Sequence, residues 1–223
     1  MKIGCHCVLF GPAIATDTDR ILGDLAKTGC GGVELGARFF GLERSAELKA
    51  ALERHGLVLA GLHAAVPLAQ LLDQPEESRA TLASAAKALR EMPEKNIIMT
   101  GIAGNVDDAA AGDERLGDPA EVEKLVTRLD AIADEIRTVY GVQIHYHNHS
   151  WEFQNNGLIY HTLLRLAKSL RLCLDTGWAA VSGFDPVALM QSRPDTFRYI
   201  HLRDYSRAAA AAASCFAQMQ ETA

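Results

Sequence analysis

Histidines recur at every second position around residue 147, and they are the clearest sign of chemistry in this sequence. The segment Val142–His149 reads V-Q-I-H-Y-H-N-H. If it forms a strand, side chains two residues apart share a face, so His145, His147 and His149 lie opposite the aliphatic side chains. Imidazoles bind divalent metals and accept protons near neutral pH. The alternation therefore indicates a face that could hold a metal or move a proton.

Other apolar runs show the same alternation and end in a polar side chain. These residues are Glu34, His63, Asp175 and His201. One such residue at a strand end is more often a hydrogen-bonding group than a ligand, and Glu34 could simply pair with Arg38 or Arg54. Five equivalent positions, counting His147, are harder to explain in that way. A ring of imidazoles and carboxylates suits Mn, Zn, Co or Mg.

Short apolar runs alternate with segments of helical spacing along the chain. The expected strands are 2–9, 32–35, 57–62, 96–100, 142–147, 170–174 and 197–202. The expected helices are 18–28, 45–55, 76–91, 119–140 and a short one from 185, with Asp118 as the N-cap of the fourth. Seven repeats of strand and helix predict parallel pairing with right-handed crossovers.

An open doubly wound sheet and a closed barrel both fit this alternation. The open sheet would carry a G-x-G-x-x-G turn after the first strand, whereas residues 11–15 read G-P-A-I-A. The pattern favours a (β/α)8 TIM barrel, with aliphatic faces against helices and active-site residues at the carboxyl ends of the strands. The chain has 223 residues, and such a barrel typically needs about 250. We therefore expect one domain over 1–205, a missing or altered eighth strand and helix, and an atypical alanine-rich tail over 206–223.

Composition narrows the class of protein. The net charge of −6 argues against a nucleic-acid partner, and no apolar run is long enough to cross a membrane. Five scattered cysteines predict no disulfide framework, which favours a cytoplasmic location, and Cys5-His6-Cys7 is interpreted as core packing. Uncovered hydrophobic residues on the first and seventh strands would show that this chain does not close the barrel. A second copy could then close it, as a homo-oligomer.

Five motifs carry a resemblance to a known family. They are Gly32–Leu35 (G-V-E-L), Gly61–His63 (G-L-H), Tyr146–Phe153 (Y-H-N-H-S-W-E-F), Leu174–Trp178 (L-D-T-G-W) and Tyr199–Asp204 (Y-I-H-L-R-D). Their order resembles that of the xylose-isomerase-like TIM-barrel superfamily, in particular its sugar phosphate isomerase/epimerase branch with a Y-H-N-H-x-x-E-F motif. The match covers roughly residues 1–205.

The resemblance implies a divalent metal at the barrel mouth, held in the wider superfamily by Glu, Asp, His and Glu from strands five to eight. Asp175 and His201 match the second and third ligands. His147 occupies the first position, and Glu152 could reach the metal from the following loop. The fourth ligand has no counterpart. The expected metal ligands are therefore His147, Glu152, Asp175 and His201.

The remaining candidates would bind substrate or transfer protons. We expect proton transfer by His147, His149, Glu152 or Glu34, and substrate binding by His63, Asn148, Trp178 and Arg203. Trp178 could instead pack on the barrel rim, and Arg203 could form a local salt bridge with Asp204.

A metal that chelates a carbonyl and its adjacent hydroxyl stabilises the enediolate formed when the α-proton leaves. The sequence therefore predicts an isomerase or epimerase of a sugar or keto-sugar. With a β-leaving group the same chemistry gives a lyase or dehydratase. The non-enzyme alternative is a catalytically degenerate sugar-binding barrel. A DNA-repair endonuclease of the endonuclease IV type is disfavoured by the net charge.

Overall fold

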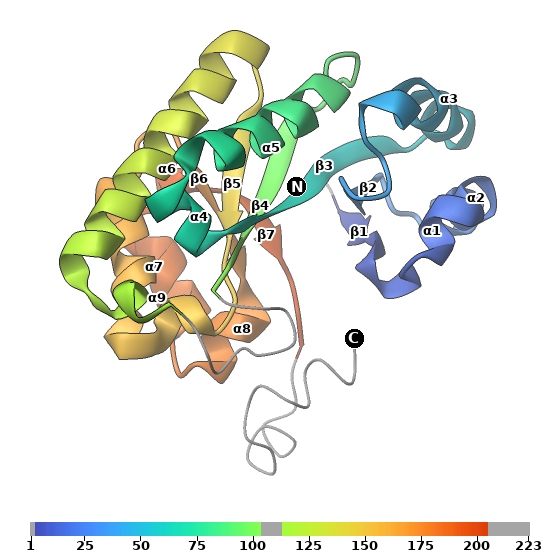
Figure 1. Ribbon diagram of the computed structural model, residues 1–223. Coiled ribbons are helices and arrows are strands. Elements are labelled where there is room, and N and C mark those ends of the chain that lie inside the picture. Colours follow the sequence, from blue (N-terminus) through green and yellow to red (C-terminus); the bar gives the residue numbers. More distant parts are fainter. Residues whose placement is uncertain (1–2, 104–112, 205–223) are drawn as a thin grey trace. The chain divides into compact units, whose positions relative to one another are not determined.

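The computed structural model describes residues 3–103 and 113–204 (Figure 1), so the tail predicted at 206–223 lies outside the described residues. Seven strands lie in the sheet in chain order. They are β1 Gly4–His6, β2 Gly32–Gly36, β3 Val58–Pro67, β4 Asn96–Ile102, β5 Gln143–His147, β6 Arg171–Asp175 and β7 Phe197–His201. The pairs β1–β2, β2–β3, β5–β6 and β6–β7 are parallel, as the sequence predicts.

Helices follow or connect these strands. The α-helices are α1 Ala13–Thr16, α2 Thr18–Lys27, α3 Ser45–His55, α4 Leu68–Asp73, α5 Pro75–Ala88, α6 Pro119–Tyr140, α7 Gln154–Leu166, α8 Thr176–Val181 and α9 Pro186–Ser192. The 3-10 helices are η1 Cys7–Phe10, η2 Leu42–Arg44, η3 Glu114–Gly117, η4 Trp151–Phe153 and η5 Pro194–Thr196. The predicted bounds of α3 and α6 are confirmed. The first predicted strand is too long, because η1 begins directly after His6.

The chain divides into two compact units. The first comprises Met1–Ala64, Arg79–Met99 and Glu135–Ile144. The second comprises Ala65–Ser78, Thr100–Asp134 and His145–Ala223.

The first unit is built on β1, β2 and the larger part of β3. In its register His6 lies beside Glu34 and Gly36 beside His63, which brings three polar side chains to neighbouring strands. Helix α2 packs against α3, where Asp19 accepts hydrogen bonds from Arg54 and contacts the His55 ring at 3.0 Å. Val33 and Leu35 of β2 and Leu59 and Leu62 of β3 are buried, which anchors the strands in the core of this unit.

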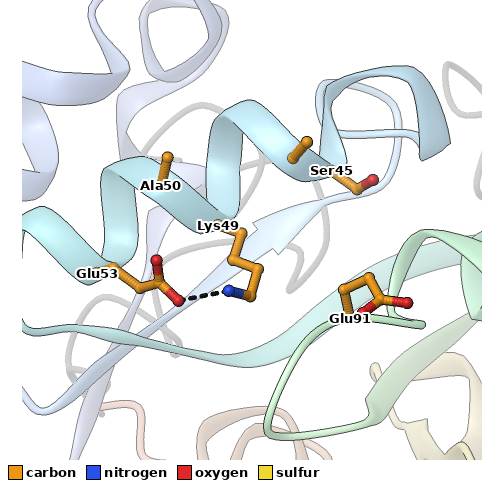
Figure 2. A pocket seen from close by; sticks show the side chains of 6 residues that line it. Ser45, Lys49, Ala50, Glu53 and Glu91 are labelled. Atoms are coloured by element: carbon orange, nitrogen blue, oxygen red, sulfur yellow. Dashed lines mark hydrogen bonds and ion pairs between the residues drawn. The ribbon is translucent and has the colours of Figure 1, made fainter.

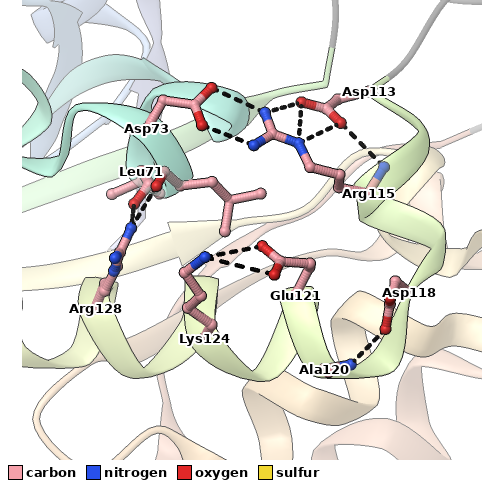
Figure 3. A network of polar contacts seen from close by, with 10 residues as sticks. Leu71, Asp73, Asp113, Arg115, Asp118, Ala120, Glu121, Lys124 and Arg128 are labelled. Carbon is pink, nitrogen blue, oxygen red and sulfur yellow. Dashed lines mark hydrogen bonds and ion pairs between the residues drawn. The ribbon is translucent and has the colours of Figure 1, made fainter.

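Helix α6 of the second unit begins where the sequence predicts. The Ala120 N–H donates to Asp118 Oδ1 at 2.8 Å, which confirms Asp118 as the N-cap. Four apolar residues at helical spacing, Val122, Leu125, Leu129 and Ile132, are buried in this unit. Just before the helix, Arg115 bridges Asp113 and Asp73, and within the helix Arg128 donates to the Leu71 and Leu72 carbonyls of α4 (Figure 3). These contacts fasten α4 to the start of α6.

The start of β6 is held by one carboxylate oxygen. Asp130 Oδ1 on α6 accepts three consecutive backbone N–H groups, from Lys168, Ser169 and Leu170, each at 2.9 Å. These N–H groups directly precede the strand. Asp130 therefore fixes where β6 begins relative to α6.

Aliphatic side chains in β7 and in the residues that flank β1 and β7 are exposed. Ile200 and Leu202 are 40% and 79% exposed, so the prediction that they face a helix is wrong within the described residues. In the first unit, Ile3 and Leu9 flank β1 and are 66% and 72% exposed. The seven described strands include no eighth strand beside them, and this exposure agrees with the expectation of a missing or altered eighth strand and helix. Among the described residues, no helix is both long and apolar enough to cross a membrane.

We predict that Asp130→Ala lowers the free energy of unfolding by about 2 kcal/mol, because three N–H groups lose a charged acceptor. Chemical denaturation with circular dichroism measures the loss. Asp130→Asn, which keeps an oxygen at the same position, should lose clearly less. Equal loss in both variants would contradict the acceptor role.

Candidate functional site

Several polar side chains of the second unit lie at the carboxyl ends of β5, β6 and β7. In the parallel register His147 pairs with Cys173, and Asp175 pairs with His201. The His147 and His201 ring centroids lie 4.6 Å apart. Alternation along the strands and parallel pairing thus bring together three residues that the sequence singled out.

A thiol that the sequence did not single out lies beside these imidazoles. His147, Cys173 and His201 each offer one donor atom, and the three atoms lie within 4.8 Å of one another. His147 and Cys173 are buried, whereas His201 is partly exposed. The signal in the sequence was the position of Cys173 two residues before Asp175, on the same face of β6. Imidazole nitrogens and a thiolate are ligands of divalent transition metals, so these residues fit the metal that the sequence implies.

Asp175 is fully buried and bonded through both carboxylate oxygens. Oδ1 accepts the Trp178 N–H at 2.9 Å, and Oδ2 accepts Arg203 Nε at 3.1 Å. The Asp175 backbone exchanges two hydrogen bonds with the Asn148 amide, which locks the β5 turn to β6. Burial raises the pKa of the Asp175 carboxyl, and the Arg203 charge and the Trp178 N–H oppose that rise.

Arg203 lies along the start of α8. Its guanidinium is 5.4 Å from the centre of the Trp178 ring, which is buried. A Cβ at Gly177 would lie 2.8–2.9 Å from three side-chain carbons of Arg203, so only glycine leaves room for the arginine. In this position Arg203 forms a salt bridge with the buried Asp175. The Arg203 side chain itself remains 35% exposed.

Glu152 is fully buried below the Y-H-N-H turn. Its carboxylate accepts the Tyr146 hydroxyl at 2.8 Å and the His149 N–H at 2.7 Å. A side chain at Gly101 would overlap the Tyr146 hydroxyl, so glycine at this position of β4 makes room for the pair. Burial raises the pKa of Glu152 to about 7, against these hydrogen bonds.

The His149 ring is partly exposed and lies between other rings. It stacks on Trp151 at 4.2 Å and meets the His147 ring edge-on at 4.7 Å. Because Glu152 holds the His149 backbone and Trp151 supports its ring, His149 has a defined position beside the His147 and His201 pair.

Within the first unit, Glu34 and His63 form a cluster with His6. Glu34 Oε1 lies 2.9 Å from His63 Nδ1 and 3.4 Å from His6 Nε2, and the two rings stack at 5.2 Å. Arg54 binds Asp19, and the Arg38 guanidinium lies over the Phe39 ring. The interpretation of Cys5-His6-Cys7 as core packing holds for the buried Cys7 but missed His6. The register that places His6 beside Glu34 was the missing information.

A shallow hollow of about 230 Å³ on α3 contains none of these residues (Figure 2). Lys49 and Glu53, which line it, form an ion pair at 2.5 Å, and Glu91 faces them. The hollow therefore adds nothing to the candidate site.

Repeated parallel βα units with polar residues at the carboxyl ends of the strands define a βα-barrel type of protein. Residues 22–219 match the xylose isomerase-like TIM barrel family, and this chain belongs to it. The resemblance and the fold class predicted from the sequence are confirmed.

Two curated relatives of this chain are inosose dehydratases. An inosose dehydratase of Geobacillus kaustophilus (strain HTA426) is 30% identical over 194 residues, which are 83% of this chain and 61% of that protein. An inosose dehydratase of Lacticaseibacillus casei is 27% identical over 58% of this chain and 45% of its own length. The chain thus spans about half to three fifths of the relatives it matches.

Solved structures show the same fold at lower identity. A sugar phosphate isomerase/epimerase from Parabacteroides distasonis ATCC 8503 has a TM-score of 0.73 and 19% identity over 91% of this chain and 75% of that one. A Mycobacterium smegmatis family member in complex with magnesium has a TM-score of 0.66 and 14% identity, covering 94% and 78%. The IOLI protein with a bound zinc atom has a TM-score of 0.61 and 16% identity, covering 88% and 70%.

We predict that Glu152 makes the folded protein less stable as the pH rises. Its pKa of about 7 in the folded state exceeds its ordinary value of 4.5, so the folded state binds the proton more tightly. The stabilisation is complete below about pH 4.5 and is lost by about pH 7, a total of roughly 3 kcal/mol.

Unfolding measured between pH 4.5 and 7.5 tests this prediction. In Glu152→Gln the decline should become smaller by the Glu152 contribution, because the amide stays neutral and can still accept the His149 N–H while its NH₂ faces the Tyr146 hydroxyl. Glu114→Gln, at an exposed position of the same unit, should keep the wild-type decline. Parallel curves for wild type and Glu152→Gln would contradict the assignment.

Proposed function

We propose that this protein is a metal-dependent enzyme that removes the proton next to the carbonyl of a keto-sugar or cyclic keto-polyol. The observation that carries the proposal is the His147–His201 pair at the ends of β5 and β7, with Asp175 in register beside His201. Membership of the family and the 30% identical inosose dehydratase support a sugar-modifying enzyme.

In this proposal His147 and His201 hold the divalent metal, with Asp175 as a neighbouring carboxylate. When bound, the metal supplies positive charge that stabilises the enediolate of the substrate. Glu152, which the sequence also nominated as a ligand, has both oxygens on protein donors. We assign it the role of holding the turn that presents His149.

His149 moves the proton. Its ring is partly exposed, lies beside His147 and is supported by Trp151, so a neutral imidazole has a fixed place from which to accept the α-proton. Arg203 keeps its Nε on Asp175, and the rest of its guanidinium donates to substrate oxygens. Asn148 contributes indirectly, because it joins the β5 turn to the Asp175 backbone.

The fate of the enediolate decides between two activities. If the substrate carries a β-hydroxyl, that group takes a proton and leaves as water, which is dehydration. The inosose dehydratase relative favours this outcome. If the proton returns to the other carbon or the other face, the result is isomerisation or epimerisation, which the Y-H-N-H-x-x-E-F motif favours.

Deuterium exchange followed by NMR tests the proposal. With a divalent metal added, a keto-inositol or a ketohexose in D₂O should take up deuterium beside its carbonyl. A dehydratase also forms a product lacking one water, and an isomerase or epimerase forms a new sugar. Exchange that needs no metal, or sugar binding with no exchange for any substrate, would contradict the proposal. The latter result would instead favour the sugar-binding barrel.

We predict that His149→Asn slows this exchange by roughly 10²–10⁴-fold, because the general base is lost. His161→Asn is the matched control, since His161 is an exposed histidine of the same unit on α7. It should exchange at the wild-type rate. An unchanged rate in His149→Asn would remove His149 from the proton-transfer step.

A further inference from the structure

We propose that Cys173 binds the metal through its thiolate, so that the site consists of two imidazoles and one sulfur and selects Zn²⁺ over Mg²⁺ and Mn²⁺. The inference rests on the metal site of the proposed function and adds a ligand and a metal to it. Metal binding can be measured without turnover, so the two proposals can fail separately.

The strands fix the thiol at this place. Cys173 lies in register with His147 on β5 and with Tyr199 on β7, two residues before His201. Cys173 and His147 are 0% and 2% exposed. The thiol is therefore held against the imidazole of a neighbouring strand by the sheet itself.

The spacing is close to that of a metal site. Zinc binds sulfur at about 2.3 Å and nitrogen at about 2.0–2.1 Å, so a tetrahedral pair of these ligands is about 3.6 Å apart. The three donor atoms here lie within 4.8 Å of one another. Small rotations of the two imidazoles about their side-chain bonds cover the difference without moving the strands.

The neighbouring oxygens are already engaged, which makes the thiolate the suitable anionic ligand. Asp175 faces Arg203 and the Trp178 N–H, and the Arg203 charge compensates its negative charge. Glu152 faces Tyr146 and the His149 N–H. The Cys173 thiol would release its proton to solvent when the metal binds. The thiolate would then supply negative charge, and the hydrogen bonds of Asp175 and Glu152 would stay in place.

The donor types determine the preferred ion. Thiolate and imidazole suit zinc, whereas magnesium and manganese prefer carboxylate, carbonyl and water oxygens. Three protein ligands also leave a fourth position open, which is the arrangement of catalytic zinc sites. His201 is the partly exposed member of the three, so solvent and substrate would reach the site through this residue.

Titration of the metal-free protein with Co²⁺ tests the proposal, because a cobalt–thiolate bond gives a near-ultraviolet charge-transfer band. We expect one such band per chain, abolished by equimolar Zn²⁺ and unaffected by excess Mg²⁺. Cys173→Ala should lose the band. Cys7→Ala, which removes another buried cysteine in the first unit, should keep it.

X-ray absorption of the zinc-loaded wild-type protein keeps the test independent of how Cys173→Ala folds. One sulfur at about 2.3 Å is expected, and a shell of nitrogen and oxygen alone overturns the proposal. A sulfur-ligated metal without deuterium exchange would retain this inference and refute the proposed function. Metal-dependent exchange without a sulfur ligand would do the opposite.

Discussion

The parallel register of β5, β6 and β7 is the constraint on which the candidate site depends. A shift of β6 by one residue would turn Cys173 and Asp175 to the opposite face and separate them from His147 and His201. The Asp130 carboxylate sets this register at the start of β6 by accepting three backbone N–H groups. At the other end, the Asn148 amide joins the β5 turn to the Asp175 backbone. Asp130 and Asn148 take no part in the proposed reaction, but they help to position the residues at the ends of β5 and β6.

Buried carboxylates in the second unit are stabilised in two different ways. Asp175 is balanced by the Arg203 cation and one backbone N–H, whereas Glu152 is surrounded by neutral donors. Burial raises the pKa of both, and for Glu152 it reaches about 7. Two glycines make these arrangements possible, because Gly101 leaves room for Tyr146 and Gly177 for Arg203. A side chain at either glycine would clash with one of these residues, so the packing of the candidate site requires glycine at both positions.

Alternation of apolar and polar residues was sufficient to predict the strands and the faces they present. It predicted polar residues at the carboxyl ends of five strands, Glu34, His63, His147, Asp175 and His201, because strand periodicity and parallel pairing are local rules. It did not predict α7 at Gln154–Leu166, whose first turn is irregular because Asn155, Asn156 and Gly157 adopt positive φ angles. It also missed His6 and Cys173. Their significance depends on which residue lies opposite on the next strand, and the register sets that partner.

The chain belongs to the xylose isomerase-like TIM barrel family, yet the candidate metal group His147, Cys173 and His201 has a thiol where the resemblance led us to expect carboxylates. The central claim is that these strand ends hold a divalent metal. Anomalous diffraction from zinc-loaded crystals tests it most directly. The account predicts one strong peak within bonding distance of His147 and His201. The absence of any peak there, or a peak only at Glu34 and His63, would contradict it.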